Sequence, residues 1–436
     1  MKKPNIIFIF TDQQHWHAVG YMDHFYTTPA LDALAADGIV FTRAYCSTPQ
    51  CSPSRSTIMT GYYPHKTGVL GNIGASGGED LQMKTIGVML QEQGYYTGYF
   101  GKWHIGKDPE GTAGWDEDHG VTGEDCYHDS MHPQMPLDFL DRMADMEKPF
   151  ALVVAINDPH DIYYFTDGER CGDEAELPDS YCQQDFSSVP KVQSDFMKYD
   201  QGRTINDKDE IAWKEYRSLY KDKIRKCDWI AAAVLQKVKE NGWYDDSLVI
   251  YSSDHGDMDT HNRLIFKGPF MYDHMLRVPL IIKAPGQKTG NRTEEMVMNT
   301  DLVPTIMDYV CGTVPEGDGL SLKPLCEGSS MGREEVVAQY YGKQKWVNPI
   351  RTIITKRYKY NRYIMHGEEL YDLENDPGEV KNLAGDPDYR EIKNELSNKL
   401  NIWIKENNDP FDSLVSTDRE GVPLGGVKLT VETSPI

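Results

Sequence analysis

The run Ile6-Ile7-Phe8-Ile9-Phe10, followed at once by Thr11-Asp12-Gln13, indicates the class of fold. Five apolar residues are too few for a helix, and their β-branched and aromatic side chains favour a strand that is buried on both faces. Three further runs have the same character, namely Tyr95–Phe100, Phe150–Ile156 and Leu248–Ser252. Together the four runs predict a large, mostly parallel sheet of an α/β protein.

Side chains that can bind ligands or transfer protons directly follow each run. They are Asp12 and Gln13, Lys102 and His104, Asn157 and His160, and Asp254 and His255. In open α/β sheets, ligands bind beyond the carboxyl ends of the strands, so we expect these segments to meet in one crevice. The first and last pairs offer three oxygen donors and one imidazole, which suits Ca²⁺, with Mg²⁺ as the alternative. A simpler alternative is that the two aspartates only cap the turns after their strands.

Helical spacing and capping residues predict the helices that flank this sheet. They are Ala30–Asp37, Thr85–Gln93, Asp209–Asn241, with or without a break inside it, and Leu302–Val310. Residues 106–135 and 161–208 show little periodicity, which is typical of substrate-facing lids or of disorder. The Gly-, Pro- and Ser-rich segment Gly312–Gly332 predicts a boundary between a large α/β domain, residues 1–332, and a smaller domain, residues 333–436.

The smaller domain has an α+β pattern. Val336–Tyr340, Arg351–Thr355, Tyr358–Ile364 and Glu369–Leu373 predict antiparallel strands, and Tyr389–Glu406 predicts a closing helix. The expected fold is therefore a large mixed, mostly parallel sheet flanked by helices, with a smaller α+β C-terminal domain.

Composition and charge exclude several classes of partner. The 436 residues have a net charge of −23 at pH 7, which argues against nucleic acid and anionic membranes as partners. No run of about 18 apolar residues is present, and the basic start has no cleavage site, so we expect a cytoplasmic protein with its eight cysteines mostly reduced. An anionic substrate would need locally concentrated positive charge. Nothing in the sequence indicates an oligomeric state.

A second stretch, Cys51-Ser52-Pro53-Ser54-Arg55-Ser56-Thr57-Ile58-Met59-Thr60-Gly61, predicts a short helix. Pro53 suits its first position, and Gly61 suits the left-handed residue after its last turn. Cys51 would then face free backbone N–H groups, which favour anions and lower the pKa of a thiol. The stretch therefore predicts a reactive cysteine in an electropositive setting, with an inert buried cysteine as the alternative.

The run Cys51-Ser52-Pro53-Ser54-Arg55 with its Thr60-Gly61 ending resembles the signature of the type I sulfatases, a branch of the alkaline phosphatase superfamily. Other segments resemble further parts of these sulfatases and occur in the same order along the chain. Phe10–Gln13 and Ser253–Gly256 resemble their metal-binding segments, and Gly101–Gly106 resembles their Gly-Lys-Trp-His-x-Gly segment. Phe266–Gly268 resembles the segment with their late lysine, and Glu369–Glu379 resembles their closing hairpin. The resemblance covers nearly the whole chain and implies an alkaline phosphatase-like fold.

Two positions depart from the usual family pattern. Many members have a second aspartate where this chain has Gln13, and asparagine or glutamine where it has His255. A histidine at the latter position also occurs in the related phosphonate monoester hydrolases and choline sulfatases. The reaction preference is therefore less firmly implied than the fold.

The resemblance implies a role for each site residue. A separate maturation enzyme would convert Cys51 into formylglycine, whose hydrate attacks the sulfur of a sulfate ester. Arg55 and Lys102 would orient and stabilise this nucleophile. Lys267 and a cation would neutralise the sulfate oxygens, and the implied ligands of that cation are Asp12, Gln13, Cys51, Asp254 and His255. His160 would protonate the leaving alcohol, and His104 would help to deprotonate the sulfate hemiester.

The expected function is hydrolysis of a sulfate monoester, with a glycosaminoglycan or another sulfated sugar as the substrate. The alternatives are hydrolysis of phosphonate monoesters or phosphodiesters, hydrolysis of choline sulfate, and, more remotely, a non-catalytic binding protein on this fold. For substrate contacts, the C-terminal domain offers Arg351, Arg357, Arg362 and His366 as candidates.

Overall fold

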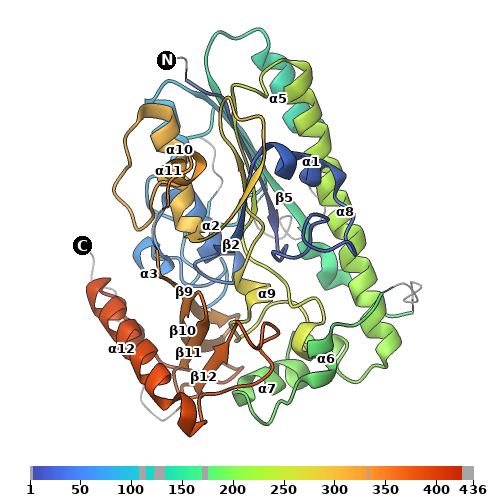
Figure 1. Cartoon of the computed structure of the whole chain (residues 1–436), viewed down its shortest axis with the longest axis vertical. Coiled ribbons are helices and arrows are strands. Elements are labelled where there is room, and N and C mark those ends of the chain that lie inside the picture. Colours follow the sequence, from blue (N-terminus) through green and yellow to red (C-terminus); the bar gives the residue numbers. More distant parts are fainter. Residues whose placement is uncertain (1–2, 108–113, 122–132, 169–174, 331–332, 425–436) are drawn as a thin grey trace.

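The computed structural model describes residues 3–107, 114–121, 133–168, 175–330 and 333–424. Its larger part is an eight-stranded sheet in the order β4-β3-β5-β1-β6-β7-β2-β8, with helices on both faces (Figure 1). The four predicted runs form β1 (Ile6–Asp12), β3 (Tyr96–Lys102), β5 (Phe150–Pro159) and β6 (Leu248–Ser253). They are neighbours in the sheet and run parallel, so their carboxyl ends lie along one edge as expected.

The sequence patterns missed the other four strands. These are β2 (Ile39–Tyr45), β4 (Glu117–Val121), β7 (Ile281–Lys283) and β8 (Asn291–Met298). β7 runs antiparallel to both of its neighbours, which makes the sheet mixed. β4 lies at an edge and carries mostly polar residues, so the expectation that residues 106–135 form only a loop is wrong at this strand.

The four predicted helices are present as α1 (Pro29–Asp37), α4 (Ile86–Glu92), α8 (Glu210–Glu240) and α10 (Leu302–Cys311). α8 is continuous over its 31 residues, so a break inside it is wrong. The other α-helices of this larger part are α2 (Cys51–Thr60), α3 (Pro64–Thr67), α5 (Gln134–Met143), α6 (Asp179–Gln183), α7 (Lys191–Tyr199), α9 (Asp273–Leu276) and α11 (Lys323–Cys326). Residues 161–208 thus include α6 and α7 and do not form only a loop.

The helices bury the two faces of the sheet in separate apolar layers. α1, α5 and much of α8 pack on one face, around residues such as Ile7 and Ile9. α2, α4 and α10 pack on the other face, around residues such as Phe8 and Phe10. Each buried Leu, Ile or Phe side chain contributes about 1.5–3 kcal/mol, so this double layer holds the strand ends rigidly in place.

The C-terminal part is a four-stranded antiparallel sheet in the order β12-β11-β10-β9. Its strands are β9 (Glu335–Lys343), β10 (Trp346–Thr355), β11 (Tyr358–Tyr363) and β12 (Gly367–Asp372), and α12 (Arg390–Glu406) packs against it (Figure 1). These elements match the predicted strands and closing helix, whereas the boundary between residues 332 and 333 stays a prediction.

Contacts tie the smaller sheet to the larger part of the molecule. The backbone N–H of Gln339 in β9 donates to the Ser47 carbonyl at 2.7 Å, four residues before Cys51. The buried Lys359 Nζ donates to Asp273 of α9 and, at 2.7 Å, to Glu379 Oε1. The smaller sheet therefore lies directly beside the segments that follow the central strands.

The cysteines in the described part of the chain are free thiols. They are Cys46, Cys51, Cys182, Cys227, Cys311 and Cys326, while Cys126 and Cys171 lie outside the described residues. No helix among the described residues has both the length and the apolar character that crossing a membrane requires.

Candidate active site

Cys51 lies at the N-terminus of α2, at the carboxyl edge of the large sheet. The helix begins at Cys51 itself and not at Pro53 as predicted; Pro53 still lies in the first turn, where a backbone N–H has no helical partner. Gly61 ends the helix with a φ of 81° and donates to the Thr57 carbonyl, as predicted. All ten residues of α2 are buried, so the helix fixes Cys51 in a preformed position.

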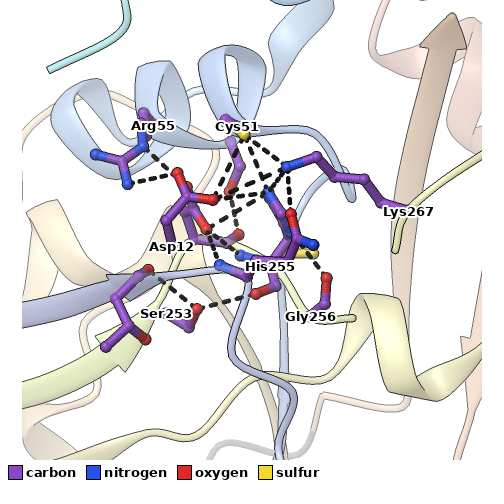
Figure 2. Close-up of polar contacts among 12 residues, drawn as sticks. Asp12, Cys51, Arg55, Ser253, His255, Gly256 and Lys267 are labelled. Carbon is purple, nitrogen blue, oxygen red and sulfur yellow. Dashed lines mark hydrogen bonds and ion pairs between the residues drawn. The ribbon is translucent and has the colours of Figure 1, made fainter. Parts of the chain in front are cut away.

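Arg55, one turn after Cys51, joins the two metal-binding candidates of β1 and β6. Its guanidinium donates to Asp254 Oδ2 at 2.8 Å and to Asp12 Oδ2 at 3.0 Å, and Lys102 Nζ lies 2.8 Å from the same Asp12 oxygen. These cations bind the Oδ2 atoms. Asp12 Oδ1 lies on the side of Cys51 and His255 (Figure 2). Asp254 Oδ1 lies 3.6 Å from His255 Nε2.

Lys267 lies at the centre of the cluster. Its Nζ atom donates to Cys51 Sγ at 2.8 Å and to His255 Nε2 at 3.0 Å (Figure 2). It also donates to Gln13 Oε1 at 2.7 Å. Burial alone would raise the pKa of the Cys51 thiol, but Lys267, Lys102 and His255 outweigh it and hold this pKa well below its ordinary value. The predicted electropositive setting of this cysteine is therefore confirmed.

Two further histidines reach the same sulfur atom. His104, after β3, and His160, after β5, each share a hydrogen bond with Cys51 Sγ. Burial lowers the pKa of His104 to about 4 and that of His160 to about 3, with Lys102 adding to both shifts. Burial therefore favours the neutral form of both imidazoles in the free protein.

The donor atoms in this cluster fit a hard divalent cation. One ligand atom from each of Asp12, Cys51, Asp254 and His255 lies within 4.8 Å of the others. His255 Nδ1 lies 2.9 Å from the Gly256 carbonyl, which fixes Nδ1 as the donor and leaves Nε2 as a lone-pair ligand. Gln13 Oε1 already accepts a hydrogen bond from one positive group, the Lys267 ammonium. The structure thus brings all five predicted ligands together.

A second layer of residues that the sequence did not single out holds this set in place. Gln13 Nε2 donates to Asp257 Oδ2 at 2.6 Å, which leaves its Oε1 atom facing Lys267. Tyr216 and Tyr220, on one face of α8, donate to Asp257 Oδ1 at 3.0 Å and to the Gln13 carbonyl at 2.8 Å. Their spacing of four residues was a usable signal, since such residues share a helix face.

A pocket of about 390 Å³ adjoins the cluster and shares His160 and Lys267 with it. Its other polar lining residues include Asn72, Tyr163, Gln201, Lys343 and Gln344. The sequence pointed to none of these, because nothing in their local pattern distinguishes them from surface residues. Lys343 comes from the end of β9, so the C-terminal sheet does contribute to the pocket wall.

The C-terminal residues that the sequence suggested as substrate contacts do not line this pocket. Arg351 is buried against Asp409, with Nε–Oδ2 and Nη2–Oδ1 distances of 2.5 and 2.7 Å. Arg357 pairs with Asp372, and Arg362 donates to Asn401 and Ser397. His366 is also absent from the lining. The three arginines are thus held by partners within the smaller domain, and a contact of these candidates with the substrate stays a prediction.

Comparisons with known proteins identify the family. The family model "Sulfatase" matches residues 4–313, and the model "N-sulphoglucosamine sulphohydrolase, C-terminal" matches residues 262–406. The chain is 30% identical to an ulvan-active sulfatase of Formosa agariphila, over 97% of this chain and 83% of the relative. It is 29% identical to a delta 4,5-hexuronate-2-O-sulfatase of Bacteroides thetaiotaomicron, over 95% of this chain and 91% of the relative.

A solved structure supports the same assignment at the level of the fold. The structure of a 2-O GAG sulfatase matches with a TM-score of 0.86 and 27% identity, and the match covers 95% of each chain. This similarity and the mixed, mostly parallel sheet identify an alkaline phosphatase-like fold. The chain belongs to the sulfatase family and is a sulfuric ester hydrolase.

Proposed function

We propose that this protein hydrolyses a sulfate monoester of a carbohydrate, with a formylglycine made from Cys51 as the nucleophile. The observation that supports it most is the position of Cys51 Sγ, which contacts Lys267, His104, His160 and His255 at the end of the sheet. The relatives described as an ulvan-active sulfatase and a hexuronate-2-O-sulfatase favour a sulfated sugar as the substrate. A separate maturation enzyme is the implied partner.

The first half of the reaction transfers the sulfuryl group to the nucleophile. One hydroxyl of the hydrated aldehyde loses its proton to solvent, which the surrounding cations favour, and the resulting alkoxide attacks sulfur. The bond from sulfur to the sugar oxygen breaks, and His160 gives a proton to the departing sugar oxygen. Burial favours the neutral imidazole of His160 in the free protein, but a bound sulfate anion beside it favours the protonated form. Lys267 stabilises the non-bridging sulfate oxygens through its ammonium group.

The second half releases sulfate. His104 takes the proton of the remaining hydroxyl on the same carbon, the C–O bond to the sulfate breaks, and the aldehyde forms again and is hydrated by water. Arg55 and Lys102 hold the carboxylate of Asp12 beside the nucleophile throughout. We infer that Asp12, Gln13, Cys51, Asp254 and His255 would hold Ca²⁺, or alternatively Mg²⁺, which when bound supplies positive charge for the sulfate oxygens.

Chelation tests the cation. Dialysis against EDTA is expected to lower kcat/KM at least about tenfold and to lower Tm, because a ligand of the native state alone, present at about 100 times its Kd, contributes about 2.7 kcal/mol. Adding Ca²⁺ or Mg²⁺ back in separate samples identifies the ion that restores both kcat/KM and Tm. Asp254→Asn is the control and should lose the response to added ion. Unchanged Tm and kcat/KM in metal-free protein would contradict the proposal.

The reaction class is tested by parallel assays of matured protein on an aryl sulfate, an aryl phosphonate monoester, choline sulfate and a panel of position-defined sulfated sugars. We expect the highest kcat/KM on one of the sulfated sugars and sulfate as the released ion. A higher kcat/KM on the phosphonate or on choline sulfate would assign the protein to those activities instead. The same panel identifies the sulfate position that is cleaved.

A further inference from the structure

Lys343 is a buried lysine in the wall of the pocket beside the active site. It ends β9, on the smaller sheet, and its side chain is 8% exposed. The same pocket is lined by Lys267 and His160, which the proposed reaction places at the sulfate group and at the leaving oxygen. A group bound near Lys343 would therefore belong to the part of the substrate that lies beyond the scissile bond.

The ammonium group of Lys343 is held in place but is not neutralised. It donates to the Lys267 carbonyl at 2.7 Å and to the Tyr163 hydroxyl at 3.3 Å, and it lies 5.2 Å from the centre of the Phe196 ring. Among the described residues, no carboxylate oxygen lies within 4.0 Å of its Nζ atom. Buried lysines are almost always paired, so this arrangement is unusual.

The electrostatics of the pocket agree with this geometry. Burial lowers the pKa of Lys343 to about 7 and Lys267 adds to the shift, while Asp200, Cys51 and Asp257 oppose it only in part. A buried positive charge without a close counter-charge carries a desolvation penalty that an incoming anion would offset. The pocket thus offers the Lys267 ammonium for the reacting sulfate and a second amino group, that of Lys343, whose charged form a bound anion would favour.

We propose that Lys343 binds a second anionic substituent of the sugar, a carboxylate or another sulfate, and so selects acidic sugars over neutral ones. This inference rests on the proposed function and adds to it a preference for substrates that carry a second negative charge. The alternative is that Lys343 only positions Lys267 through its carbonyl. That role would affect every substrate alike, whereas a receptor for a second anion affects only substrates that carry one.

The kinetic test uses two pairs of sulfated sugars and the variant Lys343→Met. One pair compares a 2-O-sulfated hexuronate with the matching 2-O-sulfated hexose, and the other compares glucosamine 2-N,6-O-disulfate with N-acetylglucosamine 6-O-sulfate. We expect the native protein to prefer the more acidic member in at least one pair. Loss of a buried charge contact should then reduce that preference by about 30-fold. The pair that responds shows whether the second anion is a carboxylate or a sulfate.

The control variant is Lys345→Met, which removes the same charge from an exposed position two residues along the chain. It should keep the native preference. Three outcomes would overturn the inference: a native protein without preference in either pair, a Lys343→Met protein that keeps the preference, or an equal loss on acidic and neutral sugars. The last outcome would assign Lys343 to positioning of Lys267.

A binding measurement separates this inference from the proposed reaction. Calorimetric titration of Cys51→Ala with the four sugars needs no turnover, so it reports on Lys343 even if the native protein hydrolyses none of them. We expect Lys343→Met, in that background, to weaken binding of the acidic sugar selectively. Selective weakening without any hydrolysis by the native protein would contradict the proposed function alone. Hydrolysis without selective weakening would contradict the role of Lys343 alone.

Discussion

Replacing Cys51 with serine is expected to lower kcat on an aryl sulfate by at least about 10³-fold, provided that the protein is produced with a cysteine-specific maturation enzyme. Serine has a single hydroxyl, so a sulfate transferred to it has no second hydroxyl on the same carbon to expel it. The variant should fold normally, because a serine hydroxyl is smaller than the thiol and the surrounding donors are unchanged. In the mass spectrum of the Cys51→Ser protein, a sulfated form of the peptide that carries the substitution would show the stalled state.

The matched control is Cys182→Ser, which makes the same change at an exposed free cysteine outside the cluster. Its kcat should equal that of the native protein. In the native protein, peptide mass analysis should show an aldehyde at Cys51. An unmodified thiol in fully active protein, or a Cys51→Ser variant with a kcat within about tenfold of native, would refute the formylglycine nucleophile.

Arg55→Met is expected to lower the free energy of unfolding by about 3–5 kcal/mol, because it leaves two buried carboxylates without their shared partner. Arg55 is 1% exposed and binds both Asp12 and Asp254, so no solvent replaces it. The folded fraction should also lose about 10²–10³-fold in kcat, since the guanidinium fixes both carboxylates beside the nucleophile. Urea unfolding and kcat per folded molecule measure the two effects.

The control for this variant is Arg351→Met in the smaller sheet. Arg351 is equally buried and binds the two oxygens of Asp409, so a similar loss of stability is expected. It lies outside the pocket lining, and kcat per folded molecule should remain native. Native-like stability of Arg55→Met would contradict the proposed contribution of Arg55 to the free energy of unfolding. A large loss of kcat in Arg351→Met would restore the sequence-based suggestion that this arginine contacts the substrate.

The parts of the fold that could be predicted are those whose burial imposes a pattern on the sequence. β1 and β5 are buried along their whole length, so uninterrupted apolar runs mark them. β4 is an edge strand of mostly polar residues, and β7 has only three residues, so neither has a run long enough to recognise. Tertiary pairing with the neighbouring strand, and not local propensity, determines these two strands.

The residues of the candidate active site divide in the same way, into those that a local sequence pattern marks and those that only tertiary contacts bring into place. Asp12 and Asp254 were predictable because each comes at the carboxyl end of a buried strand, and Arg55 and Lys267 because each lies in a motif of the family. Lys343 was not predictable, because it reaches the pocket from a sheet whose placement depends on contacts such as Gln339 to Ser47. The low pKa of His160 could not be predicted either, because it arises from burial and from Lys102, which is distant in sequence.

The complete burial of α2 has a consequence for the order of events during synthesis of the protein. All ten of its residues are covered in the folded molecule, and Gln339 of the smaller sheet binds the chain just before it. Under the proposed chemistry, a modifying enzyme must therefore reach Cys51 while this segment is still unfolded, before the C-terminal strands pack against it. Modification and folding then compete in time, and conditions that slow folding raise the modified fraction of the protein.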